Sequence, residues 1–426
     1  MEKLVIEGGH PLSGTVHVHG AKNAALPILA ASVMAEGRHV IENVPNLSDI
    51  QVMIAILNEL GCKVCYKDGK VYADTGPANS SHIPDALMRQ MRSSIFLMGP
   101  LLARFGKAEV HQPGGCAIGA RKIDLHLKGL QALGARIEET AESIVCHADR
   151  LTGADIALDF PSVGATENIM MAAVKAEGIT RITNAAREPE IQDLQNYLNS
   201  MGARIVGAGT DTITIHGVRT LTPSPTAYRI IPDRIVAGTL MIAAAVTNGQ
   251  ITLRGVCPQH LTALIHVLKQ AGVQITADGD IINLCSFTKP KPIERIVTAP
   301  YPAFPTDLQS QIMVLMSLSE GLSVIKETIF EGRFKHVDEL VRMGADIRVD
   351  MSTAFIRGVP RFYGATVEAT DLRAGAALVI AGLAATGTTI VEQLHHIDRG
   401  YERIETILSS LGAKIERYVP TPVTER

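Results

Sequence analysis

The sequence predicts an α/β fold of two lobes in which buried helices are surrounded by sheets, an inside-out α/β barrel. A segment of the form Leu-x-x-x-Gly recurs six times along the 426 residues. Its glycines are 61, 134, 202, 272, 344 and 412, separated by 73, 68, 70, 72 and 68 residues. Around each glycine lie an apolar helix, an amphipathic helix and short strands, in the order β-α-β-α-β-β. Six such repeats predict two lobes of three.

The two helices of each repeat differ in their apolar pattern. The first is apolar on all sides, as in AGAALVIAGLAA (residues 374–385), so we expect it to be buried. A glycine ends it in each copy, at 37, 106, 178, 249, 321 and 387. The second has apolar residues at helical spacing, such as Ile191, Leu194 and Leu198, and we expect it to cover the first. The glycine after it suits a left-handed helix cap.

The strands follow the helices. HVIENV (39–44) follows a first helix, and DTITIHG (211–217) follows a second. The segment Pro223-Ser224-Pro225 separates the third and fourth copies and indicates a hinge between lobes. We therefore expect a cleft between the lobes to bind a ligand.

Composition excludes several classes of protein. The net charge of −3 gives no basic surface for nucleic acid or for an anionic membrane. Six cysteines lack a disulfide-framework spacing, and Cys62 and Cys65 fit two packed thiols better than a zinc site. The N-terminus lacks the apolar core of a signal peptide, and no apolar run reaches the length of about 20 residues that spans a membrane. We expect a cytoplasmic protein.

Charged residues occupy equivalent places in the repeats. The first helix is predicted to begin at Lys22, Arg92, Asp307 and Arg373, and the second at Arg121 and Arg399, with Arg333 close to that place. A cation at a helix N-terminus is mildly unfavourable for the helix. Several together favour a site for a multiply charged anion, with no metal needed, although each could be an ordinary surface charge.

Asp307 is an acid where sibling copies carry bases, in YPAFPTDLQ. Two roles are open to it. It could cap the helix, which Asp does well, or accept a proton from a substrate hydroxyl. Neighbouring cations would lower its pKa and make it a weak base at rest.

The stretch HQPGGCAIGAR (111–121) predicts a glycine-rich loop that carries Cys116 and Arg121. It is not a nucleotide P-loop, because Ala120 and Arg121 follow the last glycine where Lys and Ser or Thr are required. The alternative to a functional loop is a turn with an incidental buried cysteine.

Eight segments resemble the UDP-N-acetylglucosamine 1-carboxyvinyltransferase family of enolpyruvyl transferases. They are GAKNAALPILAA (20–31), PGGCAIGAR (113–121), SVGATENIMMAA (162–173), NAAREPEI (184–191), YPAFPTDLQ (301–309), FEGRFKHVDEL (330–340), DLRAGAALVIAGL (371–383) and HIDRGYERIE (396–405). The resemblance implies transfer of the enolpyruvyl group of phosphoenolpyruvate to the 3′-hydroxyl of UDP-N-acetylglucosamine, without a cofactor. That reaction is the first committed step of peptidoglycan synthesis.

The resemblance also implies residue roles. Lys22, Arg121 and Arg399 would bind the phosphate and carboxylate of phosphoenolpyruvate, with Arg92 and Arg373 nearby. Asp307 would take the hydroxyl proton. Cys116 would act as a general acid or bond covalently to phosphoenolpyruvate or to the inhibitor fosfomycin. The UDP-sugar would contact Asn23, Arg121, Lys122, Ile123, Asp124, Leu125, His126, Ser162, Val163, Gly164, Asp307, Phe330 and Arg333.

The same resemblance places the lobes at 22–229 and at 1–21 with 230–426, joined by two strands. Phe160 and Lys122 depart from some relatives at the diphosphate and uracil contacts, which leaves the affinity for the nucleotide open. Ser48 stands where some relatives have Lys, at a helix start that faces the active site. Two alternatives remain. A shikimate-pathway enolpyruvyl transferase would lack the loop cysteine, and a silent UDP-sugar-binding paralogue would not need Lys22, Cys116, Asp307 and Arg399. The sequence does not indicate an oligomeric state.

Overall fold

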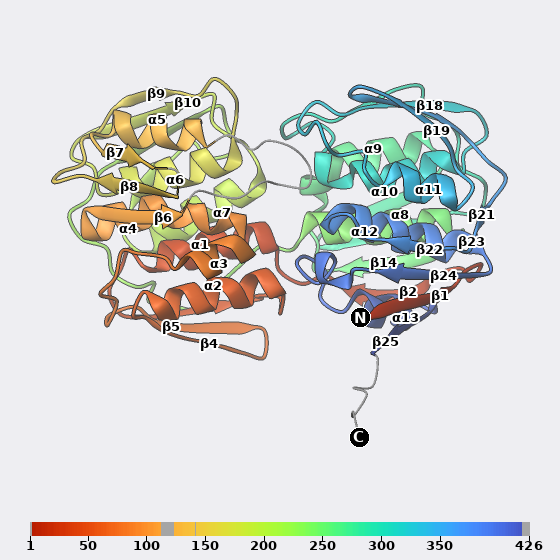
Figure 1. Cartoon of the computed structure of the whole chain (residues 1–426), viewed down its shortest axis with the longest axis horizontal. Helices are drawn as coiled ribbons and strands as arrows, with labels where there is room; N and C mark the ends of the chain where they lie inside the picture. Colours follow the sequence, from red (N-terminus) through yellow and green to blue (C-terminus); the bar gives the residue numbers. More distant parts are fainter. Residues whose placement is uncertain (1, 112–122, 141, 420–426) are drawn as a thin grey trace. The chain divides into compact units, whose positions relative to one another are not determined.

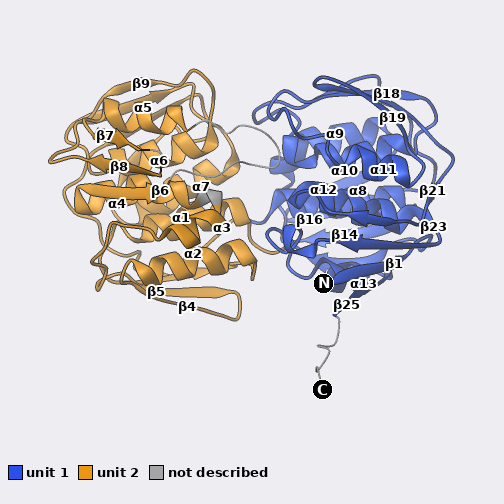
Figure 2. Cartoon of the chain, in the orientation of Figure 1, with its two compact units in different colours: residues 1–18, 116–120, 232–426 blue, residues 19–115, 121–231 orange. Residues whose placement is uncertain are grey.

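The computed structural model describes residues 2–111, 123–140 and 142–419, except for the side chains of Arg92 and Ser93. The chain forms two compact units (Figure 2). Unit 1 contains the chain up to Val18 and from Pro232 onward, and unit 2 contains the described residues from His19 to Ile231. The chain thus crosses between units at 18–19 and 231–232, whereas the resemblance implied crossings near 21 and 229. Pro223 lies inside unit 2, not at the crossing.

Unit 2 contains the first three repeats. Its helices are α1 (Lys22–Ser32), α2 (Ser48–Glu59), α3 (Asp85–Gln90), the 3-10 helix η1 (Arg92–Leu97), α4 (Met98–Phe105), α5 (Asp124–Ala132), α6 (Val163–Ala173) and α7 (Pro189–Ser200). Its strands are β3 (Arg38–Glu42), β4 (Lys63–Lys67), β5 (Lys70–Asp74), β6 (Lys107–His111), β7 (Arg136–Glu139), β8 (Ser143–His147), β9 (Asp155–Ala157), β10 (Ile179–Thr183), β11 (Arg204–Val206), β12 (Thr212–His216) and β13 (Tyr228–Arg229).

Unit 1 contains the other three repeats. Its helices are α8 (Arg234–Val246), η2 (Pro258–Leu261), α9 (Thr262–Gln270), η3 (Thr306–Leu308), α10 (Gln309–Ser317), α11 (Val337–Arg342), α12 (Leu372–Ala384), η4 (Leu394–His396) and α13 (Ile404–Ser410). Its strands are β1 (Lys3–Glu7), β2 (Ser13–His17), β14 (Gln250–Arg254), β15 (Gln274–Asp278), β16 (Ile281–Cys285), β17 (Ile296–Val297), β18 (Leu322–Lys326), β19 (Asp346–Asp350), β20 (Thr353–Arg357), β21 (Phe362–Tyr363), β22 (Thr366–Glu368), β23 (Ala385–Thr386), β24 (Thr388–Glu392) and β25 (Lys414–Tyr418).

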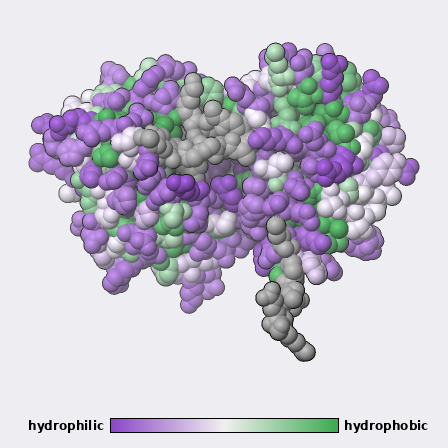
Figure 3. Space-filling model, viewed as in Figure 1, coloured by the Kyte–Doolittle hydropathy of each residue, from purple (hydrophilic) through white to green (hydrophobic). Residues whose placement is uncertain are grey.

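The apolar helices lie inside each unit, as predicted, and the strands surround them (Figure 1). In unit 1, α8, α10 and α12 contact one another, and every residue of α12 from Arg373 to Leu383 is buried. Small residues allow this close packing. At Gly375, an added Cβ would lie only 2.6 Å from a side-chain atom of Ile397, which is too close for two carbon atoms. Figure 3 shows hydrophilic residues over most of the visible face, with hydrophobic residues between them.

Two strands are exchanged between the repeats. β2 precedes α1 in the chain but pairs in parallel with β14, which follows α8. β13 precedes α8 but pairs in parallel with β3, which follows α1. Each crossing between units therefore lies just after a strand that completes a sheet in the unit that the chain is leaving.

The N-terminal strand completes the last repeat. In the sheet β22-β24-β1-β25, β1 lies between β24 and β25 and is antiparallel to both. The same place is taken by β12 in the sheet β9-β10-β12-β11 and by β20 in β17-β18-β20-β19. The sixth repeat thus takes its fourth strand from the start of the chain.

The predicted left-handed caps are confirmed. The six glycines after the second helices have φ values between +92° and +101°. Among the glycines after the first helices, Gly249 is an exception, since Asn248 takes the left-handed place with φ +52°. Gly249 instead approaches Leu12, whose carbonyl oxygen would lie 2.4 Å from an added Cβ.

Candidate active site

Asp307 lies in η3, directly before the buried helix α10. Pro305 precedes this turn in an extended conformation, which suits a residue before a helix start. The backbone carbonyl of Asp307 accepts a hydrogen bond from Gln311 Nε2 at 3.0 Å. The predicted position at the N-terminus of a first helix is therefore correct, but the carboxylate does not cap the helix.

The Asp307 carboxylate lies between two arginines. Arg333 Nη2 donates to Oδ1 at 2.9 Å, and Arg373 Nη2 donates to Oδ2 at 2.8 Å. The arginine side chains are only 3% and 5% exposed, whereas that of Asp307 is 26% exposed. Each carboxylate oxygen keeps a further lone pair for another donor.

These charges control the protonation of Asp307. Burial raises the pKa of this carboxyl, but the charges and hydrogen bonds of Arg373 and Arg333 outweigh burial and hold it well below its usual range. The group is therefore an anion at neutral pH, as the sequence analysis expected. Its affinity for a proton rises if another anion draws positive charge away from the arginines.

Arg373 is fixed by the first turn of α12. Asp371 caps this helix by accepting from the backbone N–H groups of Arg373 and Ala374 at 2.9 and 3.1 Å. Arg373 Nη1 lies 3.3 Å from the hydroxyl of Tyr401. That hydroxyl also meets Thr239 Oγ1 at 2.9 Å, so α8 and α12 share one buried polar network.

Arg333 lies in the turn 331–336, because α11 begins only at Val337. Its Nη1 donates to Thr306 Oγ1 at 3.2 Å, and Thr306 donates to Glu327 Oε2 at 2.9 Å. The other oxygen of Glu327 accepts from the backbone N–H of Phe330 at 3.1 Å. Phe330 lies against Arg333, with its ring 5.3 Å from the guanidinium carbon. Glu327 thus holds two predicted substrate residues together.

The prediction that Arg333 and Arg399 stand at or near the start of a second helix is wrong. Arg399 lies in the turn 397–400, and α13 begins at Ile404. A left-handed Arg403, with φ +43°, separates the turn from this helix. In both repeats a turn replaces the first helical residues, so these cations do not oppose a helix dipole.

In unit 2, Lys22 and Asp49 form a buried ion pair. Lys22 begins α1 as predicted, and its Nζ donates to Asp49 Oδ2 at 2.9 Å. Asp49 lies in the first turn of α2, beside Ser48. Asn23 is half-buried in the next position of α1. Arg92 is the first residue of η1, as predicted for its repeat.

Several of the residues predicted for the UDP-sugar lie in unit 2, whereas Asp307, Phe330 and Arg333 lie in unit 1. Ser162 caps α6 by accepting from the backbone N–H of Ala165, and Val163 and Gly164 begin that helix. A Cβ on Gly164 would stand 3.0 Å from His126 Cε1. Ile123 precedes α5, while Asp124, Leu125 and His126 form its first turn.

The ring of His126 has a defined tautomer. Asn168 Oδ1 accepts from the Gly99 backbone N–H at 2.7 Å, so Asn168 Nδ2 is the donor to His126 Nδ1 at 2.8 Å. His126 Nδ1 is thus an acceptor, and the ring proton is on Nε2. Asn168 is one residue that the sequence analysis did not select, although it lies in the quoted segment SVGATENIMMAA.

Cys116, Arg121 and Lys122 lie outside the described residues, so the glycine-rich loop stays a prediction. The structure adds Asp49, Glu327 and Tyr401 to the candidates. Tyr401 lies in the quoted segment HIDRGYERIE, which could have indicated it, but nothing in the sequence pairs Asp49 with Lys22.

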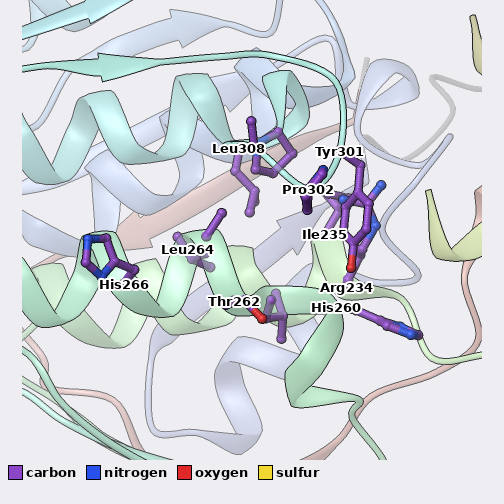
Figure 4. Close-up of a pocket in the computed structure, with 13 residues that line it drawn as sticks. Arg234, Ile235, His260, Thr262, Leu264, His266, Tyr301, Pro302 and Leu308 are labelled. Carbon is purple, nitrogen blue, oxygen red and sulfur yellow. The ribbon is translucent and has the colours of Figure 1, made fainter. Parts of the chain in front are cut away.

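A cavity of about 470 Å³ lies beside η3 in unit 1 (Figure 4). Arg234, His260, Leu264, Tyr301, Pro305 and Leu308 are among the residues that line it. The guanidinium carbon of Arg234 is 5.6 Å from the ring of Tyr301. None of the predicted substrate residues within the described ranges lines this cavity, so we do not assign the substrates to it.

Two features of the described residues concern metal ions and membranes. No group of three His, Cys, Asp or Glu side chains there could hold a metal ion. Within the same part of the chain, no helix is both long and apolar enough to cross a membrane.

Comparison with known proteins defines the class. The family model of EPSP synthase (3-phosphoshikimate 1-carboxyvinyltransferase) matches residues 6–408. The enolpyruvyl transferase NikO from Streptomyces tendae has the same fold, with a TM-score of 0.88, 27% identity and 99% of each chain covered. An EPSP synthase from Acinetobacter baumannii, at 20% identity and a TM-score of 0.77, covers 98% of this chain and all of its own, and shares the fold.

The chain therefore belongs to this family of 1-carboxyvinyltransferases. Within the family, it is 56% identical to UDP-N-acetylglucosamine 1-carboxyvinyltransferase 2 of Caldanaerobacter subterraneus subsp. tengcongensis, over 98% of this chain and 100% of the relative. It is 55% identical to the enzyme of the same name from Carboxydothermus hydrogenoformans, over 98% and 99%. The resemblance and the fold class inferred from the sequence are confirmed.

Proposed function

We propose that this chain transfers the enolpyruvyl group of phosphoenolpyruvate to the 3′-hydroxyl of UDP-N-acetylglucosamine and releases phosphate. The observation that carries the proposal is the ionised Asp307 carboxylate, partly exposed and held between two buried guanidinium groups. This is an acceptor for a hydroxyl proton inside a site for anions. Relatives at 55–56% identity are named for the transfer of a carboxyvinyl group to UDP-N-acetylglucosamine, and this name identifies the transferred group and the acceptor.

The proposed reaction has two steps. The 3′-oxygen bonds to C2 of phosphoenolpyruvate, its proton passes to Asp307, and C3 gains a proton from a general acid. The resulting ketal then loses a proton from C3 and phosphate from C2, which restores the double bond. Lys22, Arg121 and Arg399 would bind the phosphate and carboxylate, with Arg92 and Arg373 nearby, and Cys116 would supply the proton to C3 or bond to phosphoenolpyruvate.

With its low pKa, Asp307 is a weak base, so the reaction requires that bound substrate weakens its interaction with the two arginines. A bound phosphate or carboxylate shares the positive charge of Arg373 and Arg333, and this raises the pKa of Asp307 toward its ordinary value. The carboxylate then becomes a better base when both substrates are present. Burial of the arginines strengthens this effect, because little water screens the charges.

The UDP-sugar is proposed to lie along Asn23, Ile123, Asp124, Leu125, His126, Ser162, Val163, Gly164, Phe330 and Arg333, with Arg121 and Lys122. His126 would donate through Nε2, since its Nδ1 is occupied by Asn168. The proposal places the reaction in the cytoplasm, where a reduced Cys116 persists. Its product would enter peptidoglycan synthesis.

The experiment measures phosphate release from phosphoenolpyruvate with UDP-N-acetylglucosamine and, separately, with shikimate 3-phosphate. Each mixture is also run after preincubation with fosfomycin, and with Cys116→Asp. We expect release only with the UDP-sugar, loss of release after fosfomycin in the wild type, and fosfomycin resistance in the variant. Release with shikimate 3-phosphate would contradict the proposed acceptor, and release with neither would indicate a silent paralogue.

A further inference from the structure

Arg417 forms a network of ion pairs on β25 in unit 1. Its Nη1 and Nη2 donate to the two oxygens of Asp398 at 3.0 and 2.7 Å. Its Nε and Nη2 donate to the two oxygens of Glu405 at 3.0 and 3.3 Å. A fifth hydrogen bond joins Nη1 to Glu2 at 3.0 Å. The side chains of Arg417 and Glu405 are only 13% and 7% exposed, so water screens this pair weakly, whereas Asp398 and Glu2 are 32% and 47% exposed.

Asp398 directly precedes Arg399, which the proposed function assigns to phosphoenolpyruvate. Both lie in the turn 397–400, between η4 and α13. Arg417 holds the turn at Asp398 and holds α13 at Glu405, on either side of Arg399.

The other end of the turn is anchored in the core. The backbone N–H of Tyr401 donates to the Ile397 carbonyl at 3.0 Å, and its hydroxyl meets Arg373 and Thr239. Arg399, half-buried, lies between these two anchors. Arg403 has φ +43°, a conformation that persists in a non-glycine residue only where its surroundings hold it.

We propose that Arg417 is a positioning residue, which sets the direction in which the 397–400 turn presents Arg399 to the phosphate or carboxylate of phosphoenolpyruvate. The inference rests on the proposed function, because that function assigns Arg399 to this anion. A guanidinium suits the task, since its planar set of five donors reaches the carboxylates of Asp398, Glu405 and Glu2 at once. A lysine ammonium has three donors at a single nitrogen and cannot reproduce these pairs.

The test compares Arg417→Lys and Asp398→Asn with Lys414→Ala. Lys414 is on the same strand and pairs with Glu7 at 3.0 Å, but it is 58% exposed and does not contact the turn. For each variant, kcat, the KM of each substrate and the melting temperature are measured. Arg399→Ala is measured in the same assay.

We expect Arg417→Lys and Asp398→Asn to raise the KM of phosphoenolpyruvate roughly tenfold, below the loss of about 10²-fold that a misplacement of 1 Å can cause. The KM of UDP-N-acetylglucosamine should change less than about twofold in both, and Lys414→Ala should match the wild type. A purely structural role would lower the melting temperature without separating the two KM values.

Unchanged KM values for phosphoenolpyruvate in both variants, with a large increase in Arg399→Ala, would overturn the inference and leave the proposed function standing. If Arg399→Ala itself leaves that KM unchanged, the assignment of Arg399 in the proposed function is wrong, and the role of Arg417 is wrong with it. Asp398→Asn keeps one acceptor for Arg417, so it provides the test if Arg417→Lys does not fold.

Discussion

Asp307 accepts hydrogen bonds from Arg333 and Arg373, and its replacement tests both its charge and its basicity. Asp307→Asn keeps the size of the side chain but removes a proton acceptor. We expect kcat to fall by at least about 10²-fold, the usual contribution of a positioned acid or base. The KM of phosphoenolpyruvate should stay the same or fall, because the site becomes more positive. Steady-state kinetics measures both.

The matched control for Asp307→Asn is Asp346→Asn, an exposed carboxylate on β19 that lies 3.8 Å from Arg357. It should leave kcat unchanged. A kcat of Asp307→Asn within tenfold of the wild-type value would remove Asp307 from the role of base.

The same carboxylate predicts a dependence of stability on pH. The pKa of Asp307 is lower in the folded than in the unfolded chain. Its stabilisation is therefore present above the unfolded value of about 3.9 and is lost as the pH falls toward the folded value. Urea unfolding between pH 7 and pH 3 should show a smaller acid-induced loss of stability in Asp307→Asn than in the wild type. Equal losses would contradict the assigned pKa.

Among the residues, comparison of equivalent positions in the six repeats predicted which charged side chains lie near helix starts. It did not predict which of them form ion pairs. Asp307 and Arg373 were placed correctly, because Asp307 lies in the turn directly before α10 and Arg373 lies in the first turn of α12, and the apolar pattern locates both helices. The contact of Arg333 with Asp307 depends on the turn 331–336, and the pairing of Lys22 with Asp49 depends on how α1 packs against α2. Tertiary packing determines both contacts, and a single sequence does not show which residues pack together.

Among the elements, α7 carries a carboxylate that holds the chain just before it leaves unit 2. Asp193 accepts from Tyr228 Oη at 2.7 Å and from the backbone N–H of Ile231 at 3.1 Å. Burial raises the pKa of Asp193 from 3.8 to about 6, although both hydrogen bonds oppose the rise. The folded chain thus binds a proton more tightly at this group than the unfolded chain does.

The sign of this effect is opposite to that of Asp307. The stability that comes from protonated Asp193 is complete below about pH 3.9 and is lost as the pH rises through about 6. At 1.36 kcal/mol per pKa unit, the loss is about 3 kcal/mol. Asp193→Asn should remove this part of the pH dependence, as measured by urea unfolding at pH 4, 5 and 7. A variant with the wild-type slope between pH 4 and 7 would contradict it.

The cap of α7 is a second test among the elements. Gly202 has φ +101°, and an added Cβ would meet nothing within 4 Å, so backbone conformation alone should set the cost of a side chain. Gly202→Ala should destabilise the chain by about 1–2 kcal/mol, and Gly202→Asn by less, because Asn tolerates the left-handed region. Thermal unfolding of the three proteins gives the order. Equal stability of Gly202→Ala and the wild type would argue against this cap.

At the scale of elements, the apolar period predicted the buried helices and the glycines predicted their caps. The starts of the second helices were harder to predict. In the fifth and sixth repeats a turn precedes the helix, and the left-handed Arg403 delays α13 to Ile404. Gly332 and Gly400 lie in these two turns and could have indicated a break before each helix, but nothing in the sequence marks Arg403 as a left-handed residue.

For the whole molecule, the two ends of the chain share a sheet. Ile6 on β1 is fully buried against α12, since an added Cβ on Gly382 would stand 3.0 Å from its Cδ1. Ile6→Ala should destabilise unit 1 by about 2–5 kcal/mol. Ile213→Ala, which is as buried on β12, should do the same to unit 2. Amide hydrogen exchange, measured for each residue, shows which unit each variant destabilises.

In Ile6→Ala, we expect faster amide hydrogen exchange in β24 and β25 and an unchanged rate in β10 and β11. Ile213→Ala should give the reverse. Equal loss of protection in both units from either variant would show that the units do not unfold separately. The resemblance placed residues 1–21, which contain β2, in one lobe with 230–426. The parallel partners of β2 and β13 were not predicted, because the residues of a strand do not indicate which strand it pairs with.

The central claim is that this chain joins enolpyruvate to the 3′-oxygen of UDP-N-acetylglucosamine with Asp307 as the base. The direct measurement is an NMR time course of both substrates with the wild type and with Asp307→Asn. We expect vinyl protons of a product linked at the 3′-oxygen, inorganic phosphate in equal amount, and at least about 10²-fold slower formation with the variant. An unreacted 3′-hydroxyl, or equal rates for the two proteins, would contradict it.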